Sequence, residues 1–206
     1  LIDPPNGRMP AYTQQAQERL QAAAELRASR GAFAGPESRP LAERCLMSFG
    51  SSSGPPMLPI LYNNHYQIVQ SPGYVMILVE MVHDARIIRI DADPLPEAFR
   101  PWMGDSVAHW ESDTLVVETS RLNPSQKFRN ATENFRITER FTRVSDNVIN
   151  YSFTAEDPDT FAKPFSAEMP MKLTDDILYE YACHEGNYSL PGVLAGARLD
   201  EAEQSD

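Results

Sequence analysis

The chain has 206 residues, of which 42% are hydrophobic and 23% are charged, a composition typical of a folded domain and not of a disordered segment. Its formal net charge of −11 argues against nucleic acid as a partner, because phosphate binding needs clustered lysine and arginine side chains. No apolar run approaches the roughly 18 residues that span a bilayer, so we expect no membrane insertion.

Residues 1–61 are predicted to form an N-terminal arm that contains one helix, over residues 13–30. Thr13 is a favourable N-cap, the interior is rich in Ala, Gln, Glu and Arg, and Gly31 follows where helix ends favour glycine. The remainder of the arm is rich in proline, glycine and serine and is predicted to be irregular. A long irregular stretch is unusual inside a compact domain, so we expect an arm that wraps the domain or binds a partner.

Residues 62–190 are predicted to form an antiparallel β domain, because the hydrophobic period there is two. Successive hairpins joined by short turns form a meander, and curling such a sheet protects its exposed edges. The predicted fold class is therefore mainly β, an antiparallel up-and-down barrel or half-barrel (lipocalin-like); a curved sheet wrapped around a helix is the alternative. Residues 191–206 form an acidic C-terminal tail. The predicted strand pairs are 74–82 with 85–91, 107–111 with 114–121, 135–144 with 148–155, and 165–171 with 177–184.

Cys45 and Cys183 are the only cysteines, and their spacing matches neither a zinc site nor a redox motif. They form either one disulfide, which would stabilise the fold by about 4–5 kcal/mol in an oxidising compartment, or two buried free thiols. A disulfide would hold the arm beside the polar cluster 183–188, where we expect any functional site to lie. We expect no metal and no cofactor, because the four histidines lack ligand spacing and no nucleotide-binding motif is present.

Two polar clusters supply the candidate catalytic residues. His83 and Asp84 stand at a predicted bend, and His184 and Glu185 stand at the end of the last predicted strand. A histidine beside a carboxylate is the pairing that acid–base catalysis uses. The alternative is structural, because Asp and His are also common in turns.

The candidate ligand-binding residues begin with Glu80 and Glu139, which stand in line with apolar residues of their predicted strands. A carboxylate that points into a core is either paired with arginine or held protonated. Arg86 is the candidate for holding an anion. The remaining members are aromatic or amide side chains near strand ends: Tyr62, Asn64, Trp110, Tyr181, Asn187 and Tyr188.

Several segments together resemble a widespread family of uncharacterised exported bacterial proteins. They are residues 3–8, 55–59 with 62–64, 83–86, 102–106 with 110–111, 113–119, and 179–188. The likeness covers nearly the whole chain, although glycines are expected where this chain has Ala108 and Ser112. The resemblance implies export, hence a periplasmic or secreted location and a chain from which a signal segment has been removed. It implies no chemistry.

Three functional hypotheses follow. The favoured one is an exported β-barrel protein that binds a small molecule in a partly apolar, aromatic-lined pocket. The second is a cofactor-free lyase, isomerase or hydrolase in the same pocket, with His83 or His184 as the base. The third is an accessory subunit that docks through the N-terminal arm, which could also mediate a homo-oligomer.

Overall fold

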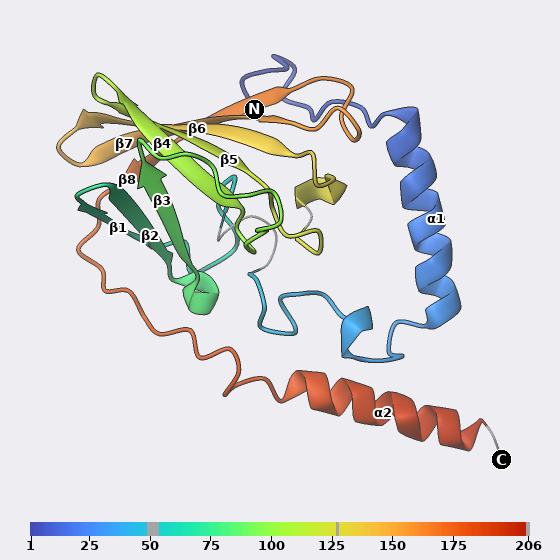
Figure 1. The fold of residues 1–206 in the computed structure, drawn as a ribbon. Coiled ribbons are helices and arrows are strands. Elements are labelled where there is room, and N and C mark those ends of the chain that lie inside the picture. The colour runs from blue at the N-terminus through green and yellow to red at the C-terminus, as the bar shows by residue number, and fades with distance from the viewer. Residues whose placement is uncertain (49–53, 127, 205–206) are drawn as a thin grey trace.

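The computed structural model describes residues 1–48, 54–126 and 128–204. Eight strands form one sheet in sequence order, and the sheet curls into a half-barrel (Figure 1). The predicted fold class is thereby confirmed, in its half-barrel form. The strands are β1 (Tyr66–Ser71), β2 (Tyr74–Val79), β3 (Ala85–Ile90), β4 (Asp105–Glu111), β5 (Thr114–Ser120), β6 (Arg136–Ser145), β7 (Val148–Glu156) and β8 (Phe165–Lys172). The helices are α1 (Gln14–Arg30) and α2 (Ser189–Glu203), with short 3₁₀ turns η1 (Pro36–Ser38), η2 (Met81–His83) and η3 (Phe128–Asn130).

Three of the four predicted hairpins are confirmed: β2 with β3, β4 with β5, and β6 with β7 are antiparallel pairs. The meander is interrupted once, because β3 and β4 run parallel. A parallel pair needs a connection that returns the chain to the starting end of the sheet. Residues 91–104, which include Pro94, Pro96 and Pro101, make that return as irregular chain.

The inner face of the half-barrel holds the core. In β6 the side chains of Ile137, Glu139 and Phe141 are buried while that of Arg136 is exposed, as the period-two pattern predicts. Across the sheet, inward-facing residues lie opposite one another and form rows. One row joins Trp110, Leu115, Phe141 and Tyr151 on four successive strands.

The predicted strand 177–184 is wrong, because the chain leaves β8 and continues to residue 188 without forming a strand. The outer edge of β8 gives the physical reason. The backbone of Ser166 faces that edge, where it exchanges hydrogen bonds with Ile2 and Asp3. Backbone groups of alternate residues face the same way, so Pro170 also faces outward, and it has no N–H to donate to a ninth strand.

The arm wraps the half-barrel. The predicted helix is confirmed as α1, with the Thr13 side chain accepting a hydrogen bond from the Ala16 amide at 3.0 Å. The predicted Cys45–Cys183 disulfide is also confirmed and joins residues 138 positions apart. Residues 54–57 are buried in the sheet's interior.

The two helices lie outside the sheet (Figure 1). Helix α1 buries only Ala16, and α2 has no buried residue. Of the predicted acidic tail, residues 191–203 lie in α2, and residues 205–206 are outside the described residues. Arg198 of α2 donates a hydrogen bond to the Phe33 carbonyl, which links that helix to the arm. Across the part of the chain described, no helix has the length and apolar character needed to cross a membrane.

Candidate functional site

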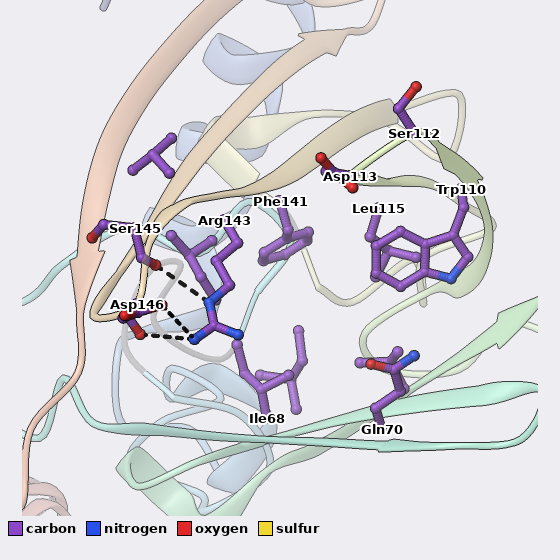
Figure 2. Close-up of a pocket in the computed structure, with 14 residues that line it drawn as sticks. Ile68, Gln70, Trp110, Ser112, Asp113, Leu115, Phe141, Arg143, Ser145 and Asp146 are labelled. Carbon is purple, nitrogen blue, oxygen red and sulfur yellow. Dashed lines mark hydrogen bonds and ion pairs between the residues drawn. The ribbon is translucent and has the colours of Figure 1, made fainter.

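An open hollow of about 640 Å³ lies at one end of the half-barrel, beneath the β4–β5 and β6–β7 turns. Figure 2 shows Ile68 and Gln70 of β1 on one side, facing Trp110, Leu115 and Phe141 on the other. The second group comes from the cross-strand row described above, so the register of three strands assembles this wall. Val75, Ile77, Val144 and Ile149 complete the apolar lining.

The mouth of the hollow is polar. Arg143 is held against its own turn: Nε donates to the Ser145 carbonyl at 3.3 Å, and Nη2 donates to the Asp146 carbonyl at 3.1 Å (Figure 2). These bonds leave Nη1 available, within the described residues, to donate to a ligand. Asp113, Ser112 and Gln70 line the remainder of the mouth. An apolar interior with a few polar groups at its rim is the usual form of a small-molecule site.

A second hollow, of about 890 Å³, continues from the first into the gap between β1 and the open end of the β7–β8 hairpin, where β7 begins and β8 ends. The two share Ile68, Gln70, Arg143 and Ile149, among others. Tyr66 lines the second hollow, and burial raises the pKa of its phenol to about 12. Because they share these lining residues, the two hollows form one continuous depression along β1.

A buried polar network lies deeper in the half-barrel. Arg86 pairs with Glu139 through two hydrogen bonds, one of them 3.0 Å from Nη1 to Oε1, and donates to Ser106 and Thr119. Arg86 is 2% exposed and Glu139 is 0% exposed. Both are candidate ligand-binding residues from the sequence, but here they bind each other. Of the two alternatives given for Glu139, pairing with arginine is the one that the structure shows.

Tyr151 connects this network to the arm. Its hydroxyl donates to Glu139 Oε1 at 2.7 Å and accepts the Met57 amide at 3.0 Å. Burial, and then the negative charge of Glu139, raise the pKa of the Tyr151 phenol well above its usual range, so it remains a donor. The network thus fixes the position of the buried residues 54–57.

Glu80 lies just beyond β2 in a separate polar cluster. It is 2% exposed and accepts hydrogen bonds from Asn63 Nδ2 at 2.8 Å. The His65 ring nitrogen Nδ1 lies 2.7 Å from its other oxygen. The candidate Asn64 bonds through its side chain to both backbone groups of Ile60, which makes it a turn-stabilising residue.

Of the candidate residues at the bend and in the C-terminal segment, His83 and Tyr181 are in contact. His83 Nδ1 accepts a hydrogen bond from the Tyr181 amide at 3.1 Å. The Tyr181 side chain bonds to Tyr62, and burial together with Tyr62 raises the pKa of the Tyr181 phenol. Asp84 is half-buried beside this bend. No hydrogen bond or ion pair within the described residues joins His83 to His184.

The polar cluster 183–188 lies on the surface. Asn187 donates to the Glu43 carbonyl at 2.7 Å and contacts the disulfide sulfur of Cys45 at 3.5 Å. His184 and Glu185 are exposed, and Tyr188 is 82% exposed. The disulfide therefore holds the arm at this cluster as predicted, and residues 183–188 line neither of the two hollows.

Only Trp110 of the sequence-derived candidates lines the first hollow. Its partners Ile68, Leu115, Phe141 and Arg143 were not predicted as site residues. The available signal was the alternation in the strands, which marks these side chains as inward but does not say which of them lie opposite one another.

The chain was also compared with known proteins. No protein-family model matches it, no curated protein matches it, and no solved structure matches it.

Proposed function

We propose that this protein binds a small molecule with an apolar body and a hydrogen-bond-accepting oxygen at one end, in the first hollow. The observation that carries the proposal is the apolar wall of Trp110, Leu115 and Phe141 facing Ile68 across about 640 Å³. That volume lies within the roughly 300–1,000 Å³ typical of small-ligand sites.

The polar mouth supports the choice of ligand. Arg143 is preoriented by its bonds to the turn, so its remaining N–H groups can bind an oxygen acceptor with little loss of side-chain entropy. Asp146 forms an ion pair with Arg143 at 3.6 Å, and Asp113 also lines the hollow, so the lining carries no excess of positive charge. This balance favours a neutral ligand over a strongly anionic one.

We place the protein in the periplasm or outside the cell. The Cys45–Cys183 disulfide supports this location, because disulfides persist in oxidising compartments.

The acid–base enzyme receives no support from the hollow. Of the described residues that line it, none is a histidine or a glutamate. The N-terminal arm is bound to its own domain through Ser166 and the disulfide, and no observation favours a partner there.

Binding of the apolar body of the ligand can be tested by titration with N-phenyl-1-naphthylamine, an uncharged apolar fluorophore that brightens when shielded from water. We expect saturable binding to the wild type and loss of binding in Val144→Trp, which adds bulk to the lining of the hollow. Val144 is 58% exposed at the hollow, and Val193 on α2 is 39% exposed and remote from it, so Val193→Trp is the matched control. Equal binding by both variants would contradict the proposal.

A further inference from the structure

The outer edge of β1 presents unpaired backbone groups. In the sheet, β1 pairs with β2 alone, and the turn between them consists of Pro72 and Gly73. Ser71 and Tyr74 flank that turn as a hydrogen-bonded pair, so bonded and non-bonded pairs alternate from there. Ile68 and Gln70 fall on non-bonded pairs, and their N–H and C=O groups therefore point away from β2. Within the described chain, no hydrogen bond joins these groups to another segment.

The composition of β1 does nothing to protect this edge. The strand reads Tyr-Gln-Ile-Val-Gln-Ser, with no charged residue, proline or glycine. Ile68 and Val69 are 40% and 41% exposed. Exposed edge strands are normally protected by charged residues, proline or a covering segment, because an unprotected edge can pair with another strand.

The opposite edge of the same sheet is protected by a covering segment and by a proline. Ile2 and Asp3 cover the start of β8, and Pro170 removes an outward donor further along it. The sheet therefore protects its last strand and leaves its first strand open.

The space beside β1 suits a single extended chain. The second hollow lies between β1 and the end of β8, with Met169, Met171 and Leu173 on its far side. Its charges balance, with Arg143 and Lys172 against Asp146 and Asp176, in a protein whose net charge is −11. An uncharged occupant fits this locally neutral groove better than an acidic or basic one.

We propose that the outer edge of β1 is a docking site for an extended, uncharged peptide, which adds to the sheet as a further strand. A strand needs only about 4.8 Å beside its neighbour. A second folded copy would have to bring its bulk past β8 and residues 173–178, which form the other wall. This site adjoins the proposed small-molecule site and shares Ile68, Gln70 and Arg143 with it, whereas Trp110, Leu115 and Phe141 line only the first hollow.

The test uses a fluorescein-labelled Val-Thr-Val-Thr-Val-Thr peptide and fluorescence anisotropy with the full chain. The variant Ile68→Pro removes the outward N–H without removing a bond to β2, and Ile68→Ala is its matched control because both lose the same side chain. We expect Ile68→Pro to bind the peptide about tenfold more weakly than Ile68→Ala. Circular dichroism and thermal melting establish that both variants fold.

A second experiment does not depend on the folding of the proline variant. A peptide N-methylated at its two central residues cannot donate from either edge there, and we expect it to lose binding to the wild type. The proposal is overturned if the unmodified peptide does not bind, or if the methylated peptide binds equally well. It is also overturned if the peptide-free protein forms dimers that Ile68→Pro abolishes, because the occupant is then a second copy. Wild-type affinity of Val144→Trp for the peptide would support peptide binding beside β1 and outside the part of the first hollow that Val144 lines.

Discussion

The buried ion pair between Arg86 and Glu139 gives the sharpest stability prediction. Glu139→Gln keeps the shape of the side chain and an oxygen that can accept from Tyr151, but it removes the negative charge. The Arg86 guanidinium, 2% exposed, is then left charged without a counterion. Breaking one partner of such a pair costs about 3–5 kcal/mol. This is a large share of the roughly 5–15 kcal/mol by which domains are stable.

Urea unfolding without reductant, followed by circular dichroism, measures the effect. We expect a lower midpoint with an unchanged dependence on urea concentration, since the surface exposed on unfolding does not change. The double variant Arg86→Met with Glu139→Leu removes both charges, and Ser106 and Thr119 can still bond to each other. We expect it to be more stable than Glu139→Gln. A loss below about 1 kcal/mol for Glu139→Gln would show that the Arg86–Glu139 pair is not isolated from solvent.

Three further predictions concern separate parts of the molecule. Reducing the Cys45–Cys183 disulfide, which spans 138 positions, should lower the free energy of unfolding by about 4–5 kcal/mol, measured as a shift in the urea midpoint with reductant. The Tyr66 phenol has its pKa raised from 10.0 to about 12, so its contribution to stability is present below pH 10 and is lost as the pH rises through 12. Tyr66→Phe should flatten the stability profile over that range, and an unchanged profile would contradict burial as the cause. Tyr151→Phe removes the bonds to Glu139 and Met57 and should cost about 1–3 kcal/mol in the same unfolding assay; an unchanged midpoint would mean that the two bonds contribute nothing.

The sequence predicts the local features of the fold well, because they depend on neighbouring residues. Alternation in residues 135–144 and 148–155 marks two strands and their inward faces, and a short polar turn joins them. The cap at Thr13 and the glycine at position 31 delimit α1 in the same way. Each of these signals is contained within a few residues.

The predicted fourth hairpin is wrong because its formation depends on more than the residues within it. Residues 177–184 alternate like a strand, but a strand also needs an open edge to pair with. Whether Pro170 blocks the edge depends on which way its backbone faces, and this depends on the pairing of β8 with β7. Alternation alone does not contain that information.

In the candidate site too, the sequence predicts what depends on neighbouring residues but not what depends on strand pairing. Apolar neighbours around Glu139 indicate a buried carboxylate, and the structure pairs it with Arg86. The wall formed by Trp110, Leu115 and Phe141 depends on the register of three strands, which no single segment reveals. The histidines were emphasised for their chemistry, and their side chains lie outside the first hollow.

Amide chemical-shift mapping of the isotope-labelled protein during titration with N-phenyl-1-naphthylamine locates the small-molecule site. Binding in the first hollow predicts that the perturbed amides cluster within residues 68–77, 110–115 and 141–149, the segments that line it. Perturbations centred on residues 183–188 and absent from those three segments would contradict the account and would place the site at the disulfide.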